Sequence, residues 1–457
     1  MIGYSMYGEH FLALRAKTNR NPVDEIFSRI PVINHERKER NLPPIIDLSI
    51  GEPHLGINDN VIKSLNQFLH PSETDFVLPY SPFPGNQDSL ELITHLYKRY
   101  YPSVDYSTKE VMITNGATQG IWNALSILIN AEDQVLTFEP YFAAYENQIR
   151  ALGGTLIKIP THDHYFQPSG RRLEESLAKF PKAKAIILNY PNNPTGIDLS
   201  EQTIMDIVTV LAKYPNLCII IDDVYRELTI SMHLTVLDIN PSLKNRCIVV
   251  NSASKGLIGA PGLRAGMVAA NSEWIERMIN IQAITTGGIS ALTQQALMAG
   301  INEKLNTTFK YQAWLTKTIQ EYKINKNFVS QQIESLGFNI IPSHNGFFIL
   351  ARANFLLGKT VPNTLTMTLN NTSYTIKEIQ NKIGFSTFKT DFQIASYLMH
   401  VAGVAVVPGS AFGISESTAY LRFSCAKHFS QLEQACAAIH AAIAPISEFA
   451  DLEHSHA

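Results

Sequence analysis

Several features are scarce in the sequence, and each shortage excludes a class of protein. Charged residues make up only 17% of the 457 residues, and 37 Lys and Arg against 40 Asp and Glu leave a net charge of −3. Without a basic surplus to neutralise a phosphate backbone, nucleic acid is excluded as a partner. Apolar runs such as VAGVAVV fall far short of the ~18 residues that span a bilayer. We therefore expect no membrane partner.

Cysteine is also scarce. The four cysteines, Cys218, Cys247, Cys425 and Cys436, form no C-x-x-C pair, and the first three lie in apolar segments where a thiol behaves as a small hydrophobe. The first residues lack the basic stretch, apolar run and cleavage pattern of a secretory signal. These features predict reduced thiols, no metal site and a cytoplasmic protein.

Short apolar runs recur between about residues 105 and 270, each followed by a turn and a segment of helical period. The runs are EVMIT, QVLTF, TLIKI, KAIIL, CIIID, CIVVN and GMVAA. Runs of four or five apolar residues are typical of strands covered on both faces, which predicts an α/β fold with a mostly parallel sheet. In such sheets the functional residues lie at the carboxyl ends of the strands.

The length predicts two or three domains of ~150 residues each. We expect residues 71–320 to form a large domain and residues 321–457 a smaller α+β domain, with a long helical stretch from about Asn302 to Leu336 leading into it. Residues 1–70 are expected to form an arm and to return to the smaller domain. Residues 358–390 are polar with little periodicity, which indicates an inserted loop.

One lysine has unusual neighbours. Lys255 follows the run CIVVN within SASKGLIGAPGLRAG, among residues too small and apolar to solvate an ammonium group. Desolvation and nearby cations lower the pKa of such an amine, so it can lose its proton and condense with an aldehyde. Ser252, Ser254 and Arg264 in the same segment suit an anion such as phosphate. A lone lysine of this kind is more often an ordinary surface charge.

A pair of carboxylates supports the interpretation that Lys255 is a reactive amine. Asp222 and Asp223 end the apolar run CIIID, where a carboxylate is costly unless it faces a cation or is well hydrogen-bonded. Asp222 could pair with a protonated pyridine nitrogen, as in pyridoxal phosphate enzymes, whereas Asp223 suits a simple cap. Tyr225 could offer its hydroxyl to the oxygen of the same ring, although a lone tyrosine here would more often serve packing.

The third segment is NYPNNPTG, in which Pro191 and Pro194 stiffen a turn and fix the directions of Asn189 and Asn193. By itself it would be an ordinary connection from strand to helix. Taken together and in this order, NxPNNPTG, DDVY, SxSK and PGxRxG resemble the class I/II aminotransferases, the aspartate-aminotransferase-like enzymes of pyridoxal-phosphate fold type I. The resemblance runs from IGEPHL near residue 50 to YLRFSCA near residue 425.

The resemblance implies a large domain with a mostly parallel central sheet plus a smaller α+β domain, and pyridoxal 5'-phosphate as the cofactor. It implies that Lys255 forms a Schiff base with the cofactor and moves the substrate proton. An amino acid and a 2-oxo acid would react in turn in a ping-pong cycle. It also implies a homodimer, because Tyr80 in LPYSPFPG matches a tyrosine that reaches the partner subunit's phosphate.

The resemblance assigns further roles. The residues implied to bind the cofactor, besides Lys255 and Tyr80, are Ala117, Thr118, Phe142, Asn193, Asp222, Tyr225, Ser252, Ser254 and Arg264. Among them Asp222 would bind the ring nitrogen, Tyr225 and Asn193 the ring oxygen, and Phe142 the face of the ring. Arg422 would bind the substrate α-carboxylate through two hydrogen bonds, close to the backbone of Gly51 and to Asn193.

Two other functions stay open from the sequence. A lyase, catalysing β-elimination or decarboxylation, would use the same lysine and cofactor. A cofactor-binding regulatory domain would need a DNA-binding unit ahead of the fold, yet only about forty residues precede IIDLSIGEP. The residue that recognises the substrate side chain is not identifiable from the sequence.

Overall fold

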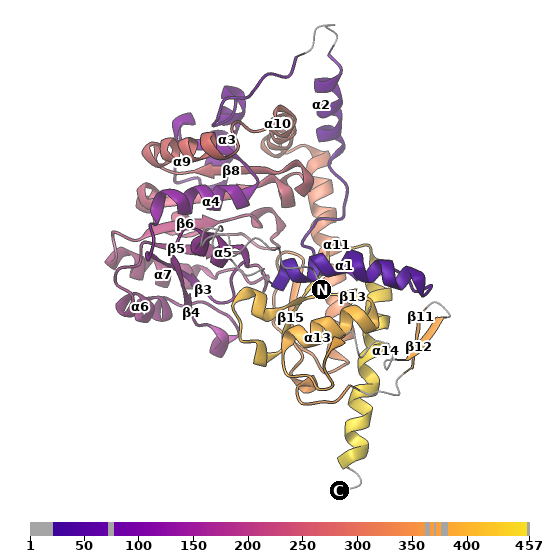
Figure 1. Ribbon diagram of the computed structural model, residues 1–457. Coiled ribbons are helices and arrows are strands. Elements are labelled where there is room, and N and C mark those ends of the chain that lie inside the picture. Colours follow the sequence, from indigo (N-terminus) through magenta and orange to yellow (C-terminus); the bar gives the residue numbers. More distant parts are fainter. Residues whose placement is uncertain (1–21, 72–76, 362–365, 370–371, 376–382, 455–457) are drawn as a thin grey trace, which may run out of the picture.

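The computed structural model describes residues 22–71, 77–361, 366–369, 372–375 and 383–454 (Figure 1). Its principal helices are α1 (Pro22–Glu39), α2 (Asp59–Leu69), α3 (Gln87–Tyr100), α4 (Ala117–Leu128), α5 (Ala144–Ala151), α6 (Gly170–Lys179), α7 (Glu201–Lys213), α8 (Val236–Ile239), α9 (Ser272–Thr285), α10 (Ala291–Leu305), α11 (Phe309–Glu334), α13 (Asp391–Tyr397) and α14 (Phe429–His454). Among the helices that these residues form, none is long and apolar enough to cross a membrane.

The larger sheet has seven strands in the order β2-β8-β7-β6-β5-β3-β4. The strands are β2 (Val111–Asn115), β3 (Gln134–Phe138), β4 (Thr155–Ile159), β5 (Ala185–Asn189), β6 (Cys218–Asp222), β7 (Cys247–Ser252) and β8 (Ala265–Ala269). Each of these apolar runs, predicted to be a strand, overlaps one of the seven. The sheet is mostly parallel, as predicted, since only β8 runs antiparallel to its neighbours β2 and β7.

Both faces of the larger sheet are buried because successive side chains of a strand point to opposite faces. In β6, Ile219 and Ile221 pack on the face covered by α3, α6, α7 and α10, whereas Ile220 packs on the face covered by α4, α5 and α9. The same alternation holds for Ile186 and Ile187 of β5. A strand with helices on both sides needs a continuous apolar run, which explains the sequence pattern.

The smaller sheet is antiparallel, in the order β14-β15-β10-β9, and beside it β1 pairs with β13. The strands are β1 (Ile46–Asp47), β9 (Asn339–Ile340), β10 (Phe348–Arg352), β13 (Val404–Ala405), β14 (Val407–Pro408) and β15 (Tyr420–Ser424). Side chains of α1 and of α13 and α14 share its apolar core. The N-terminal residues thus return to the C-terminal elements, although α2 packs on α10 beside the larger sheet. The domain boundaries themselves stay a prediction.

Two expected segments differ in detail. The long helical stretch is two helices, because Thr307 has a φ of 49° and Thr308 caps the start of α11 by accepting a hydrogen bond from the backbone of Tyr311. Within residues 358–390, the described part contains a hairpin of β11 (Thr366–Leu369) and β12 (Thr372–Thr375). Residues 362–365, 370–371 and 376–382 of that insertion lie outside the described residues.

The middle of β6 provides a test of the buried sheet. Ile220 is fully buried, so Ile220→Ala should lower the free energy of unfolding by ~2–5 kcal/mol through lost burial and the cavity that remains. The control is Ile324→Ala on α11, where the side chain is 59% exposed and the loss should stay within ~1 kcal/mol. Urea denaturation measures both. Equal losses would contradict the assignment of Ile220 to the core.

Candidate functional site

A pocket of about 550 Å³ lies where β5, β6 and β7 end, and residues of β10 and β15 also line it. The site residues predicted from the sequence that line it are Gly51, Ala117, Thr118, Phe142, Asn193, Asp222, Tyr225, Ser252, Ser254, Lys255, Arg264 and Arg422. Tyr80 alone among the predictions is elsewhere: its side chain is fully exposed and does not line the pocket of a single chain. The fold thus gathers predicted residues that lie as far apart in the sequence as Gly51 and Arg422.

Lys255 lies on a single π-helical turn, Ala253–Leu257, that follows β7. Its Nζ donates a hydrogen bond to the carbonyl oxygen of Gly51. Burial, with a further contribution from the positive charge of Arg422, lowers the pKa of the Lys255 amine to about 8. No carboxylate of the described residues forms a hydrogen bond or an ion pair with this amine, although the charge of Glu52 partly offsets the lowering. At that pKa roughly a tenth of this amine is neutral at pH 7, far more than for an ordinary lysine, and the neutral form is the one that a nucleophile requires.

Asp222 ends β6 with its carboxylate buried at the pocket. Oδ2 accepts a hydrogen bond from the hydroxyl of Tyr145, while Oδ1 has no hydrogen-bond partner among the described residues. Burial raises the pKa of Asp222 to about 7, and the neighbouring charge of Asp223 adds to the rise. A buried carboxylate with an unpartnered oxygen beside a pocket suits a cationic group of a ligand.

Arg422 of β15 is buried in the wall of the pocket. Its Nη1 donates to Oδ1 of Asn193 at 2.8 Å and its Nη2 to the carbonyl oxygen of Ser49, while Nε has no partner among the described residues. The guanidinium carbon lies 4.2 Å from the ring centroid of Phe348 and 4.8 Å from that of Phe412. Burial lowers the pKa of Arg422 to about 10. An anion bound here would compensate that desolvation.

The stiff turn after β5 connects these groups. The backbone N–H of Asn193 donates to Oδ1 of Asn189 at 3.0 Å, and Nδ2 of Asn189 donates to the carbonyl oxygen of Asp222 at 3.1 Å. The side chain of Asn193 also hydrogen-bonds Tyr225, although burial is the larger effect and raises the pKa of that phenol. Asn193 therefore contacts both Arg422 and Tyr225.

The start of α4 forms the other end of the pocket. Gly116 has a φ of 77°, and a Cβ there would lie 2.3 Å from Nη2 of Arg264. A Cβ on Gly266 would lie 2.7 Å from the backbone nitrogen of Ala117. Two glycines thus let a guanidinium and a strand approach the N-terminus of the helix. Such a helix start with a nearby cation is a binding site for an anion such as phosphate.

Ser252 and Ser254 lie beside this helix start. Ser252 Oγ accepts a hydrogen bond from the backbone N–H of Ser254 at 3.0 Å. Oγ of Ser254 is buried without a hydrogen-bond partner among the described residues, yet the residue lines the pocket. Both hydroxyls can therefore serve a bound anion.

The sequence did not identify every residue of the site. Tyr145 was missed, although it lies three residues after Phe142 and thus on the same side of a helical turn. Val23, Asp24 and Phe27 of α1 also line the pocket. No local signal marks them, because only the tertiary fold brings α1 there.

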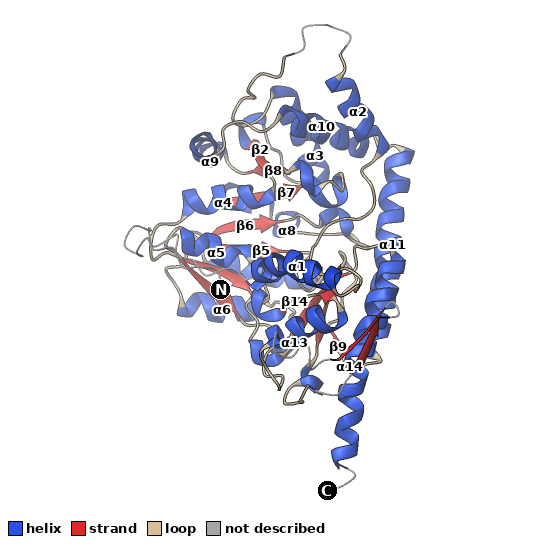
Figure 2. Cartoon of the chain, turned by 45° about the vertical axis from the view of Figure 1, so that its right-hand side comes forward, coloured by secondary structure: helices blue, strands red, loops and turns tan. Residues whose placement is uncertain are grey.

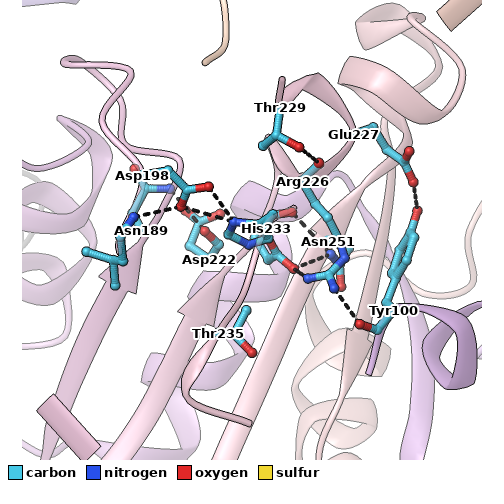
Figure 3. Close-up of polar contacts among 12 residues, drawn as sticks. Tyr100, Asn189, Asp198, Asp222, Arg226, Glu227, Thr229, His233, Thr235 and Asn251 are labelled. Atoms are coloured by element: carbon cyan, nitrogen blue, oxygen red, sulfur yellow. Dashed lines mark hydrogen bonds and ion pairs between the residues drawn. The ribbon is translucent and has the colours of Figure 1, made fainter. Parts of the chain in front are cut away.

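Asp223 does not line the pocket but belongs to an ionic network, of which Figure 3 shows Arg226, His233 and Asp198. It pairs with Nη1 of Arg226 at 2.9 Å and with Nε2 of His233 at 2.9 Å, and His233 reaches Asp198 at 2.8 Å through Nδ1. Burial alone would raise the pKa of Asp223, but Arg226 and His233 outweigh it and lower that pKa. The network connects the end of β6 to the segment after Asn193.

Comparisons with known proteins identify a family and similar sequences. A sequence model of the family described as "Aminotransferase class I and II" matches residues 43–439. A probable aspartate/prephenate aminotransferase of Rhizobium leguminosarum bv. phaseoli is 28% identical over 396 residues, covering 86% of this chain and 89% of the relative. An aspartate aminotransferase of Thermotoga maritima is 27% identical over 393 residues, covering 86% and 89%.

Solved structures show the same fold. The aspartate aminotransferase of Rhizobium meliloti superimposes with a TM-score of 0.80 at 24% identity, covering 94% of this chain and 98% of the other. That of Thermus thermophilus with maleate has a TM-score of 0.76 at 18% identity, covering 94% and 98%. At these identities the likeness bears on the fold alone, and it confirms the expected pyridoxal-phosphate fold type I.

The ionic network predicts a pH-dependent stability. Burial lowers the pKa of His233, but Asp223 and Asp198 outweigh it and raise the value to about 9 from 6.5. A group whose pKa is higher in the folded chain than in the unfolded chain stabilises the fold. For His233 this stabilisation is complete at pH values below the unfolded pKa of 6.5, and it is lost as the pH rises through about 9. His233→Gln should therefore destabilise the chain by as much as ~3 kcal/mol at pH 6 and by much less at pH 9.5.

Urea denaturation of the wild type and of His233→Gln at the two pH values measures this difference. The control is His35→Gln on α1, where the side chain is exposed and the change should be small at both pH values. A destabilisation by His233→Gln that is the same at pH 6 and pH 9.5 would contradict a charged His233 between two carboxylates.

Proposed function

The chain belongs to the class I and II aminotransferase family, and from this membership we propose that Lys255, Asp222 and Arg422 carry out its reaction. It is a pyridoxal-phosphate-dependent aminotransferase, which moves an amino group from an α-amino acid to a 2-oxo acid. The relatives are named aminotransferases, which favours this reaction over the lyase alternative. The observation that supports this proposal most strongly is that one pocket contains three such groups. They are the amine of Lys255 with its lowered pKa, the buried carboxylate of Asp222 with an unpartnered oxygen, and the buried guanidinium of Arg422.

The pocket fits the cofactor. The start of α4, with Ala117, Thr118, Ser252, Ser254 and Arg264, would hold the phosphate. The unpartnered oxygen of Asp222 would meet the ring nitrogen, with Tyr225 and Asn193 at the ring oxygen and Phe142 against the ring. When bound, pyridoxal phosphate supplies an aldehyde that condenses with amines and a ring that withdraws electrons from the substrate Cα.

Lys255 has the properties of both a nucleophile and a base. Its amine lies in the pocket wall, is partly neutral near pH 7, and reaches the backbone of the segment that contains Gly51. In this proposal the Lys255 amine would be the group that holds the cofactor through its aldehyde, and the same amine, when free, would take the proton from the substrate Cα.

Asp222 stabilises the positive charge of the ring nitrogen. Its high pKa in the chain alone reflects burial without a cation, so a cation facing Oδ1 would favour the ionised form. Tyr145 fixes the carboxylate by donating to Oδ2, which leaves Oδ1 for the ligand.

Arg422 binds the carboxylate that both substrates share. Donor and acceptor differ at Cα, where one has an amine and the other a ketone, but each has an α-carboxylate. Ser49 and Asn193 hold the guanidinium in place, and the rings of Phe348 and Phe412 exclude water from it. One anchor can therefore serve both halves of a ping-pong cycle.

The proposal includes a homodimer in a cytoplasmic location. Tyr80 is fully exposed, and the same segment exposes Val77, Leu78 and Phe83. Exposed apolar side chains gathered in one segment are typical of an interface. A second copy covering this segment would bring Tyr80 toward a pocket that is not its own. The cytoplasmic location is supported by the reduced, scattered cysteines.

Lys255→Ala should abolish transamination, and borohydride reduction of the wild type should attach the pyridoxyl group to Lys255. Peptide mapping by mass spectrometry locates the label. Lys326 is a demanding internal control, because burial lowers its pKa to about 8 as well, yet it does not line the pocket. Label on Lys326, or activity that survives Lys255→Ala, would contradict the assignment.

Arg422→Ala should raise KM for both the amino donor and the oxo-acid acceptor, at a cost of ~2–5 kcal/mol in kcat/KM, because each loses the same charged partner. Arg422→Lys should recover only part, since an ammonium group lacks the two-pronged geometry. The control is Arg352→Lys on β10, which lies outside the pocket and should leave both KM values unchanged. A rise in only one KM would contradict a shared carboxylate anchor.

A further inference from the structure

We infer that Asp391 is a positioning residue: it does not contact the substrates, but it determines how tightly Arg422 binds their shared α-carboxylate. Asp391 itself does not line the pocket. It acts through residues 409–413, which we call the Phe412 turn and which place the ring of Phe412 against Arg422. The inference rests on the proposed function, since it takes Arg422 as the anchor of that carboxylate.

The first argument is the way in which Asp391 holds the Phe412 turn. Asp391 is the first residue of α13, and its side chain is fully buried. Oδ2 accepts a hydrogen bond from the backbone N–H of Ser410 at 2.6 Å, and Oδ1 accepts one from the hydroxyl of Ser410 at 3.0 Å. Burial raises the pKa of Asp391 to about 7, and both hydrogen bonds oppose that rise. Because a buried carboxylate is costly unless it is well hydrogen-bonded, these bonds tie the turn to α13.

The second argument is the short path from Ser410 to Arg422. Ser410 and Phe412 belong to one 3₁₀ turn. The backbone N–H of Gly413 donates to the carbonyl oxygen of Ser410 at 3.2 Å, which closes the turn. Phe412 is fully buried, and its ring centroid lies 4.8 Å from the guanidinium carbon of Arg422. Opposite charges attract more strongly where water is excluded, so the position of this ring affects how strongly Arg422 binds a carboxylate.

The third argument is the place of the Phe412 turn between the two sheets. On the side of the larger sheet, the backbone N–H of Tyr141 donates to the carbonyl oxygen of Phe412 at 3.2 Å. Gly413 has a φ of 84°, and a Cβ there would lie 2.3 Å from Cε1 of Tyr141. On the other side, α13 lies beside the smaller sheet in both views (Figures 1 and 2). Loss of the Asp391 anchor would therefore let the turn shift relative to Arg422.

The test uses the holoenzyme at pH 8, where Asp391 is mostly ionised, in single-turnover half-reactions followed by the absorbance of the bound cofactor. The reactants are L-aspartate, L-alanine, L-phenylalanine and pyruvate, which differ in their side chains and share the α-carboxylate. Asp391→Asn removes the charge and one acceptor. It should raise the half-saturating concentration of each reactant by the same factor, about threefold to tenfold, and leave the rate constant at saturation unchanged.

Two further readouts do not depend on turnover. The dissociation constant of propanoate, which has a carboxylate and no amine, should rise by the same factor in Asp391→Asn. The dissociation constant of pyridoxal phosphate should stay unchanged, because the residues assigned to its phosphate lie outside the Phe412 turn and outside α13. An unchanged affinity for the cofactor also shows that the variant is folded.

Variants of the partner residue and a matched control accompany Asp391→Asn. Ser410→Ala should have a smaller effect in the same direction, since its backbone N–H remains, whereas Ser410→Thr keeps the hydroxyl and should behave like the wild type. The control is Asp238→Asn. Asp238 likewise accepts hydrogen bonds from the backbone N–H and the hydroxyl of one residue, Thr235, at 2.7 and 2.9 Å, but it does not line the pocket. This control should leave every half-saturating concentration unchanged.

A double-mutant cycle with Phe412→Leu locates the effect. If Asp391 acts through the ring, Asp391→Asn should add little to the loss that Phe412→Leu causes alone. Additive losses would overturn the inference, as would unchanged half-saturating concentrations in Asp391→Asn, a loss that differs between the amino acids, or an equal loss in Asp238→Asn. If none of the amino acids converts the cofactor of the wild type, the proposed function fails instead.

Discussion

Removal of charged side chains from water at one edge of the larger sheet is the constraint on which the site depends. Asp222, Lys255 and Arg422 are each desolvated, and each has a pKa displaced toward its neutral form. Burial of this kind opposes folding unless another group restores the lost interactions. The cofactor and the substrate carboxylate are complementary to these three groups, so the same desolvation that weakens the empty site strengthens binding of both ligands.

The neighbouring carboxylates Asp222 and Asp223 show how one strand end serves two purposes. Asp223 has its cations in the chain, Arg226 and His233, and is therefore an ordinary buried ion-pair partner. Asp222 has no cation as a partner among the described residues and keeps an oxygen at the pocket. Because adjacent residues at a strand end point to opposite sides, one carboxylate can anchor the end of β6 while the other remains available to a ligand.

The local sequence was sufficient to predict those site residues that directly follow a strand. The apolar runs predicted the strands, and the unusual residues after them, Lys255 among them, line one pocket. Arg422 and Gly51 came only from the family resemblance, since their roles depend on strands far apart in the chain. Val23 and Phe27 were not predicted at all: a residue on an ordinary amphipathic helix acquires a role only through the place where that helix docks. The break near Thr307 was missed for a related reason, because threonine rarely adopts a positive φ.

The helix α11 has a mechanical consequence for the molecule. It runs along one side of the chain (Figure 2), and its first half packs with Tyr225 and Phe348 whereas Val329 and Ile333 belong to the core of the smaller sheet. Its 26 residues span about 39 Å as one rigid rod. Because one helix packs against both groups of side chains, a tilt of the smaller sheet that carried α11 with it would also displace the aromatic side chains beside the pocket.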